Sequence, residues 1–292
     1  MDAKDLDLDE LRPLMFSIAY RMTGSVGDAE DIVQEAVIRT YRAAHQGTIV
    51  ESPKAFVTTT TTRLAIDHLR SARVQREAYV GTWLPEPLLS DPAPGPAERA
   101  EMSDSLSLAF LVLLESLSPV ERAVFLLREV FGYDYAEIAS SVDKSEANCR
   151  QIFTRARRHI DQGRPRFEAS RRQGAELTER FLAALSGGGD IEAFIDLLAP
   201  DVVMYGDGGG KAPAARTPIR GREQVARLLR GLARQVERWV AEVRPAEVNG
   251  QPGVIAYDRD GTLFGVIAFD YAGGQVQAIR SQINPDKLRH LQ

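Results

Sequence analysis

The sequence predicts a multidomain protein in which two all-α units precede an α+β domain. Apolar residues recur at helical spacing in two separate stretches, residues 8–76 and 105–163, and a proline-rich segment lies between them. The last third of the chain instead alternates apolar and polar residues between tight-turn dipeptides. With 292 residues, of which 44% are apolar, the chain is long enough to bury a core in each part.

Composition excludes several classes of protein. No stretch approaches the roughly 18 continuous apolar residues that a membrane-spanning helix needs, and the acidic start MDAKDLDLDE is unlike a secretory signal, so we expect a cytoplasmic protein. The single cysteine, Cys149, can form no internal disulfide and has no neighbouring ligands for a structural metal. We therefore expect neither a metal nor a cofactor.

The first unit, residues 1–76, reads as three helices. Leu11, Met15 and Ile18 share one apolar face, and a second helix follows a break at 23–27. The third helix begins at Ser52-Pro53, where a hydroxyl residue precedes proline at the first helical position, and it runs toward residue 76.

Residues 77–104 form the predicted linker, with five prolines between Pro85 and Pro96 and an acidic balance. The second all-α unit, residues 105–163, contains a complete helix start at Ser118-Pro-Val-Glu121, with cap, proline and capping-box glutamate in order. A basic linker, residues 164–175, leads to the third domain.

Residues 176–292 change pattern. Helices are expected over 176–185, 191–198 and 222–234, with a glycine-rich loop at 206–210. Strands are expected over 242–248, 254–259, 262–271 and 275–283, joined by Asn-Gly, Asp-Gly and Gly-Gly turns. The prediction is a curved antiparallel sheet packed on helices.

Residues 135–158 fit a helix-turn-helix, with Asp143-Lys144 as the turn and Cys149, Phe153 and Ala156 on the buried side of the second helix. Between residues 144 and 172, nine Lys and Arg face three acids, a balance suited to phosphate contact. The alternative is a helical hairpin with a solvated basic face. The outward positions predicted to read DNA are Lys144, Ser145, Glu146, Asn148, Arg150, Gln151, Arg155 and Arg158.

Longer matches support the DNA-binding interpretation. The stretch LRPLMFSIAYRMTGSVGDAEDIVQEAVIRTY resembles region 2.1–2.2 of RNA polymerase sigma factors, and PKAFVTTTTTRLAIDHLRSARVQRE resembles regions 2.3–2.4. LSPVERAVFLLREVFGYDYAEIA through RARRHI resembles region 4. Two such regions with only a linker between them are the layout of the extracytoplasmic-function (ECF) sigma factors, and the resemblance covers residues 8–163.

The resemblance implies a protein that performs no chemistry and directs RNA polymerase core to promoter DNA. It implies a polymerase-binding face at Asp28, Asp31, Gln34 and Glu35, for which the alternative is an ordinary solvated acidic face. It implies −10 element contacts at Arg63, Arg70, Arg73 and Arg76, and −35 contacts at the outward residues of the helix-turn-helix. The run Thr58–Thr62 departs from helix preference, and its hydroxyls either face DNA or are buried.

The third domain resembles the SnoaL-like, or NTF2-like, fold, and the whole chain resembles the sigma-J-like group in which such a domain follows a sigma factor. Three motifs carry this resemblance, WLPEP at 83–87, DGGGK at 207–211 and NPDKL at 284–288. We expect the domain to bind the linker and regulate the sigma regions in cis, without a separate anti-sigma factor. The residues expected to make these contacts are Trp83, Leu84, Asp207, Lys211, Asn284, Asp286 and Lys287. The alternative is that each motif only completes its local fold.

Two other functions stay open at this stage. SnoaL relatives include cyclases and isomerases that use a carboxylate, so Asp207, Asp258 or Asp270 could serve an enzyme, although no histidine precedes His290 in this domain. The domain could also be a sensor that holds a small-molecule ligand in its cone.

Overall fold

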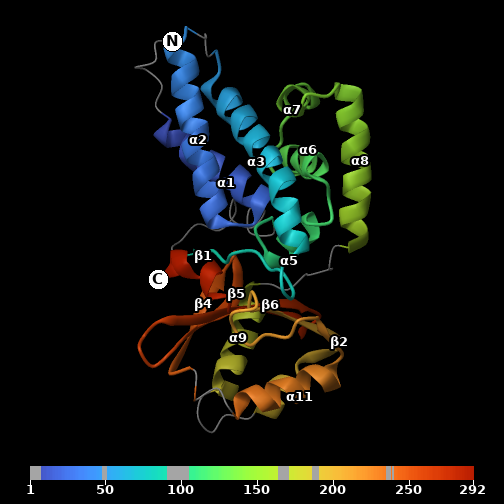
Figure 1. The fold of residues 1–292 in the computed structure, drawn as a ribbon. Coiled ribbons are helices and arrows are strands. Elements are labelled where there is room, and N and C mark those ends of the chain that lie inside the picture. The colour runs from blue at the N-terminus through green and yellow to red at the C-terminus, as the bar shows by residue number, and fades with distance from the viewer. Residues whose placement is uncertain are drawn as a thin grey trace. The chain divides into compact units, whose positions relative to one another are not determined.

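The computed structural model describes residues 8–47, 51–90, 105–163, 171–185, 191–234, 238 and 240–292. They belong to two compact units, one made of residues 1–77 with 111–164 and the other of residues 78–110 with 165–292 (Figure 1). The linker segment 78–90 and the segment 105–110 thus belong to the same unit as the C-terminal domain.

The first unit is helical throughout its described residues. Its elements are η1 (Asp9–Leu11), α1 (Arg12–Thr23), α2 (Val26–His45), α3 (Pro53–Glu77), α6 (Pro119–Glu129), α7 (Tyr135–Val142) and α8 (Glu146–Gly163). Met15, Val33 and Val57 bring α1, α2 and α3 together in one apolar cluster. The capping box predicted at Ser118 is confirmed, since its hydroxyl and the Glu121 side chain each bind the other's backbone amide.

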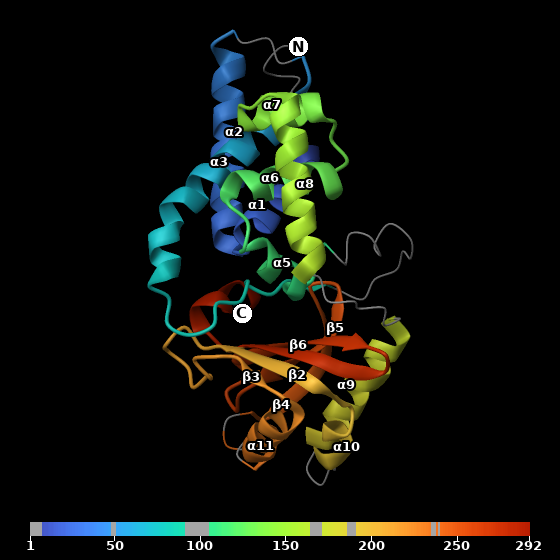
Figure 2. The ribbon, with the colours of Figure 1, turned by 90° about the vertical axis from the view of Figure 1, so that its right-hand side faces the viewer.

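The second unit is a sheet with helices on one face (Figure 2). Its elements are β1 (Leu89–Ser90), α5 (Leu108–Leu114, which continues into the first unit), α9 (Arg171–Leu185), α10 (Ile191–Ile195), β2 (Leu198–Asp207), β3 (Ile219–Arg220), α11 (Arg222–Ala233), β4 (Glu242–Val248), β5 (Gln251–Tyr257), β6 (Leu263–Ala272), β7 (Gln275–Gln282), η2 (Pro285–Lys287) and η3 (Arg289–Leu291). The strand order is β1-β4-β5-β6-β7-β2-β3. The α+β prediction for this domain is confirmed.

Three local predictions were wrong. The helix expected to reach Leu198 ends at Ile195, and β2 follows at once, with Gly206 inside the strand rather than in a loop. The sheet is mixed, because β2 runs parallel to β7. The register shift between Leu198 and Val203 lets Pro200, which has no amide hydrogen to donate, interrupt the strand, and this interruption hides its alternation in the sequence.

Two apolar clusters occupy the two faces of the sheet. The helix-covered face packs Phe181, Phe194 and Phe269 edge to face, with ring centroids 4.6–6.0 Å apart. The opposite face packs Leu108 and Leu288 against strand residues such as Val266. The linker and the C-terminal end therefore cover the face that the helices leave open.

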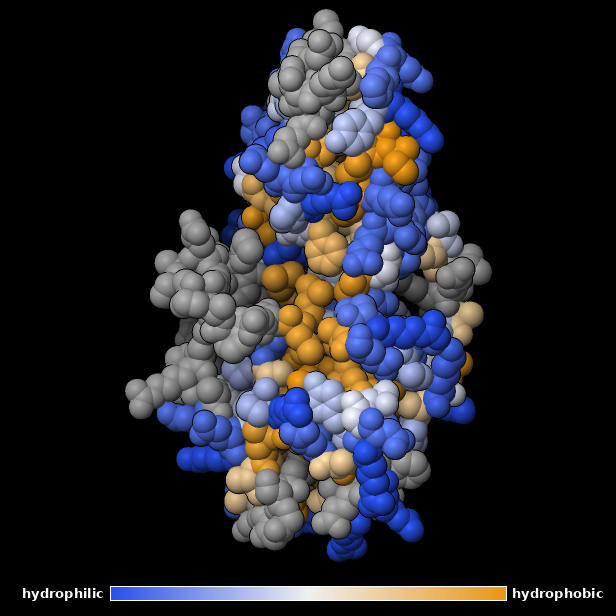
Figure 3. Space-filling view, turned by 90° about the vertical axis from the view of Figure 1, so that its left-hand side faces the viewer, coloured by the Kyte–Doolittle hydropathy of each residue, from blue (hydrophilic) through white to orange (hydrophobic). Residues whose placement is uncertain are grey.

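Hydrophobic residues gather along the middle of the face shown in Figure 3, with hydrophilic residues on both sides of them. Among the residues described, only Tyr41, Val80 and Leu232 are large hydrophobic residues that are well exposed.

Candidate functional site

The helix-turn-helix has the predicted geometry. Asp143 ends α7 in the left-handed conformation, at φ 54°, and the Ser145 hydroxyl accepts a hydrogen bond from the Asn148 amide, 3.2 Å away, at the start of α8. Cys149 and Ala156 are buried, whereas Asn148 is half-buried. The other predicted −35 residues are exposed on one surface, namely Lys144, Ser145, Glu146, Arg150, Gln151, Arg155 and Arg158.

One residue of this surface is held in place by its neighbours. The Arg150 guanidinium lies 2.8 Å from the Glu146 carboxylate and 5.0 Å from the centre of the Tyr135 ring. Arg128 lies 5.0 Å from the centre of the same ring. The sequence analysis did not single out Tyr135, because its role depends on the approach of α7 to α8.

The predicted polymerase-binding face lies along α2. Asp31 and Gln34 are exposed, and Glu35 is half-buried and lies 2.7 Å from Arg39. Asp28 pairs with His68 of α3 at 3.2 Å. The face is thus a polar surface on which Asp28 and Glu35 each have a partner within the domain.

The predicted −10 residues on α3 have different surroundings. Arg63 donates hydrogen bonds to the carbonyls of Ser140 and Ser141 at the end of α7, at 2.7 and 3.1 Å. Arg70 is exposed and lies 3.3 Å from Asp67. The side chains of Arg73 and Arg76 lie outside the described residues.

The threonine run of α3 packs on α7 and on the segment that precedes it. The Thr58 hydroxyl bonds to the Tyr133 hydroxyl at 2.8 Å, and Thr59 bonds to the Ser141 hydroxyl at 2.9 Å. Thr61 and Thr62 are fully buried. In this arrangement the hydroxyls of Thr58 and Thr59 face protein, and α7 covers part of α3.

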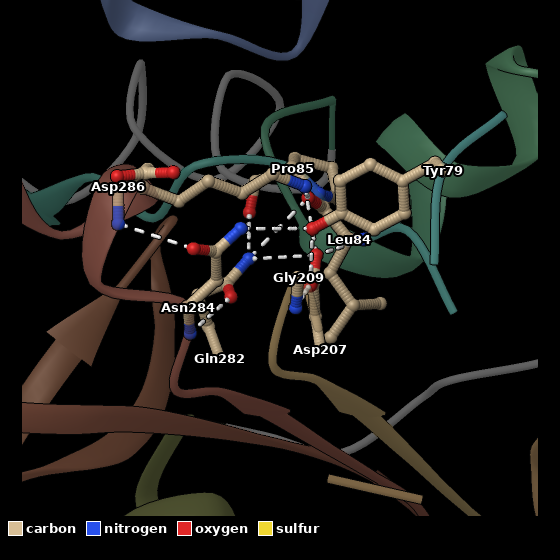
Figure 4. Close-up of polar contacts among 9 residues, drawn as sticks. Tyr79, Leu84, Pro85, Asp207, Gly209, Gln282, Asn284 and Asp286 are labelled. Atoms are coloured by element: carbon tan, nitrogen blue, oxygen red, sulfur yellow. Dashed lines mark hydrogen bonds and ion pairs between the residues drawn. The ribbon is translucent and has the colours of Figure 1, made fainter. Parts of the chain in front are cut away.

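A second site forms where the linker meets the C-terminal domain (Figure 4). Asp207, at the end of β2, is 1% exposed and accepts hydrogen bonds from the Tyr79 hydroxyl and from the Leu84 amide, 2.8 Å away. It also accepts from the amide of Gly209 and the side chain of Gln282, at 3.0 and 3.2 Å. Burial and the bond to Asp207 raise the pKa of Tyr79 well above its ordinary value.

Lys287 supplies the opposite charge in this site. Its ammonium lies 2.7 Å from the Asp207 carboxylate and 2.6 Å from the Leu84 carbonyl. The rings of Tyr79 and Trp83 lie 4.6 and 4.4 Å from it, so two aromatic faces complete its surroundings. The ammonium therefore holds three linker residues to one carboxylate.

The loop and tail motifs close around these residues. Asn284 donates to the Tyr79 hydroxyl at 2.9 Å, and Gly209, at φ 58°, approaches so closely that a Cβ would lie 2.2 Å from the Asn284 amide nitrogen. Lys211 pairs with Asp286 at the surface, and this hydrogen bond lowers the pKa of Asp286. The structure thus brings together all seven residues of the predicted linker contact.

Sequence reasoning missed a second anchor. Asn249, which is 1% exposed, donates to the Leu106 carbonyl at 3.0 Å and accepts from the Leu88 amide at 2.9 Å. One side chain therefore holds Leu88 within the linker and Leu106 just after it. The sequence marked Asn249 as a turn residue, which is also correct, since its φ is 51°.

The carboxylates of the enzyme alternative have structural partners. Asp258 accepts the amides of Asp260 and Thr262 in its own hairpin, both at 2.9 Å. Asp270 is buried in an ion pair with Arg280, where burial lowers the pKa of the guanidinium. Asp207 binds the linker residues Tyr79 and Leu84.

Comparisons with known proteins match all three parts of the chain. Residues 8–74 match Sigma-70 region 2, residues 107–160 match Sigma-70 region 4, and residues 178–282 match the SnoaL-like domain. The ECF RNA polymerase sigma factor SigJ of Mycobacterium tuberculosis is 36% identical over 97% of this chain and 92% of its own length. This chain belongs to the ECF sigma factors.

Two further similarities agree. The probable ECF sigma factor SigI of M. tuberculosis is 32% identical over 96% of this chain and 93% of its own length. The crystal structure of M. tuberculosis SigJ superposes with a TM-score of 0.75 at 34% identity, covering 97% of this chain and 98% of that one. As an ECF sigma factor, the chain directs RNA polymerase core to promoter DNA and is not an enzyme.

The described part of the chain contains neither a membrane-spanning helix nor a cluster of metal ligands. Among the residues that the structure describes, no helix has the length and apolar content to cross a membrane. The described ranges also hold no group of three or more His, Cys, Asp or Glu that could bind a metal ion.

Proposed function

We propose that this sigma factor is regulated in cis by its SnoaL-like domain, which holds the linker between regions 2 and 4 and so sets how far apart the two DNA-binding regions can reach. The observation that carries the proposal is the anchoring of the linker at both ends. Asp207 and Lys287 hold residues 79–84, and Asn249 holds residues 88 and 106.

A bound linker limits the distance between regions 2 and 4 because it restricts the conformations of the chain that joins them. A free chain of the length between Glu77 and Leu108 could span many distances, whereas a segment held at both ends spans few. Promoter recognition requires region 2 and region 4 to contact two elements at a fixed separation. A held linker therefore favours one separation over others.

The predicted −35 surface on α8 and the predicted −10 surface on α3 contact different parts of the promoter. Arg150 and Gln151, near the start of α8, read bases of the −35 element, and Arg158 contacts phosphates. Arg63 and Arg70 contact the −10 element after α7 moves away from α3. The exposed side chains of Asp31 and Gln34 contact the polymerase core.

Release of the linker needs an external source of free energy. Release breaks the hydrogen bonds of Tyr79 and Leu84 to the Asp207 carboxylate and that of the Lys287 ammonium to the Leu84 carbonyl, and a hydrogen bond to a charged group contributes about 1.5–3 kcal/mol. Contacts with RNA polymerase core can supply this amount, so no separate anti-sigma protein is needed for the resting state. The protein acts in the cytoplasm, where the polymerase is.

Transcription by purified core polymerase over a genomic promoter library tests the proposal. The full chain is compared with Asn249→Ala and with a chain that ends at Arg172. We expect all three to initiate transcription, with the two altered chains using a wider set of promoters. Identical promoter sets for the full chain and Asn249→Ala would contradict cis regulation through the linker, whereas no initiation by the full chain would contradict the sigma function itself.

A further inference from the structure

We propose that helix α11 of the SnoaL-like domain binds the phosphate backbone of nucleic acid, as a third contact beyond those of regions 2 and 4. The inference rests on the chain's role as a sigma factor, which brings DNA to it, and not on regulation through the linker. No part of this surface coincides with the linker site.

The charge of this segment is unlike that of the chain. Seven arginines and no lysine lie between residues 216 and 238, against two glutamates, although the whole chain carries a net charge of −5. Arginine presents a planar fork of donors that binds phosphate oxygens in pairs. A cluster of positively charged side chains on an otherwise acidic protein attracts anions locally.

The arginines line a groove of about 490 Å³ along α11. Arg222, Arg227, Arg230 and Arg234 form its walls with one acid, Glu223. Ile195, Ala226 and Gly231 complete its lining. Because four of the eight lining residues are arginines and one is an acid, the groove favours an anionic ligand.

Two of the arginines are available to a ligand. These are Arg227 and Arg234, and Arg230 lies between them on the same side of the helix. The Arg230 guanidinium donates two hydrogen bonds of 2.6 Å to the Glu192 carboxylate. Arg227 and Arg234 are exposed, and in the described part of the chain neither forms an ion pair. They are seven residues apart, about 10.5 Å along a helix, so their guanidinium groups can contact different phosphates of one nucleic-acid backbone.

The exposed apolar residue of α11 lies elsewhere on the helix. Leu232 is 46% exposed, but it follows Arg227 by five residues, about 140° around the helix axis. The arginine face is therefore polar along its length. This arrangement suits a hydrated phosphate backbone, whose binding depends on charge.

Fluorescence anisotropy with a labelled duplex that lacks promoter elements tests the proposal. The full chain and the double variant Arg227→Gln/Arg234→Gln are titrated over a range of salt concentrations. We expect the slope of log affinity against log salt to decrease by about 2, since each lost phosphate contact removes about 1. A matched variant, Arg180→Gln/Arg244→Gln, removes the same charge from α9 and β4 and should change the slope by much less.

Three results would overturn the proposal. The first is an unchanged slope in the double variant, and the second is an equal decrease in the matched variant. The third comes from a parallel titration with polyglutamate. If the double variant loses affinity for polyglutamate but keeps the full chain's affinity for the duplex, the groove binds an acidic protein. Failure of the chain to initiate transcription would not affect these titrations, so the two proposals fail separately.

Discussion

Replacing Asp207 by asparagine should release the linker from the C-terminal domain. The substitution keeps the shape of the side chain and removes its charge, leaving the Lys287 ammonium buried without a counterion. The side chains of the pair are 0% and 10% exposed, so solvent cannot replace the lost interaction. We expect a loss of about 3–5 kcal/mol in linker binding, which lowers its equilibrium constant by roughly two to four powers of ten.

Trp83 reports this release, because its ring contacts the Lys287 ammonium. In a Trp239→Phe background, which removes the second tryptophan, Asp207→Asn should shift the Trp83 emission to longer wavelength and increase quenching by acrylamide. Asp258→Asn is the matched control, since it makes the same chemical change in an exposed hairpin of the same domain.

The double variant Asp207→Asn/Lys287→Met distinguishes loss of this ion pair from general unfolding of the domain. If the two charges stabilise each other, removing both should destabilise the protein less than the sum of the single changes. Trp83 emission and quenching that are the same in Asp207→Asn and its parent would refute the reasoning, as would strict additivity in the cycle.

Three further predictions concern the helical unit. Arg150→Ala should change base preference in a −35 library, at about 1–3 kcal/mol per base contact, whereas Arg158→Ala should weaken all promoters alike; equal preferences for Arg150→Ala and wild type would contradict the assignment. Tyr133→Phe removes one hydrogen bond between the segment that precedes α7 and the first turns of α3, worth about 1 kcal/mol, so hydrogen exchange in the N-terminal part of α3 should become up to about five-fold faster, and an unchanged rate would show that the packing on α3 does not depend on this bond. Ser118→Ala should lower the free energy of unfolding by about 1 kcal/mol at neutral pH. Because the Ser118 hydrogen bonds lower the pKa of Glu121, that difference should shrink in urea titrations as the pH falls below about 4.3, the ordinary glutamate value.

The sequence predicted the helical units well because their signals are local. A capping box at Ser118 and a turn at Asp143-Lys144 each depend on a few neighbouring residues, and both occur where expected. Strand β2 was missed because its parallel partner, β7, lies about 80 residues away and the interruption at Pro200 breaks its alternation.

The linker site was predicted in part. The three motifs indicated which segments meet, but only tertiary structure brings Tyr79 and Gln282 to Asp207, and Asn249 to Leu88 and Leu106. The closed packing of α3 on α7 was not foreseen either. Its polar pairs, such as Thr59 with Ser141, have no pattern in the sequence that distinguishes them from a solvated surface.

The most direct test of cis regulation is run-off transcription from promoters in which the distance between the −35 and −10 elements varies by single base pairs. Purified core polymerase is combined with the full chain, with Asp207→Asn or with Asp258→Asn. We predict one narrow optimum of spacing for the full chain and for Asp258→Asn, and a broader range for Asp207→Asn. The same dependence on spacing in all three would contradict the claim that the SnoaL-like domain sets the reach of the two DNA-binding regions.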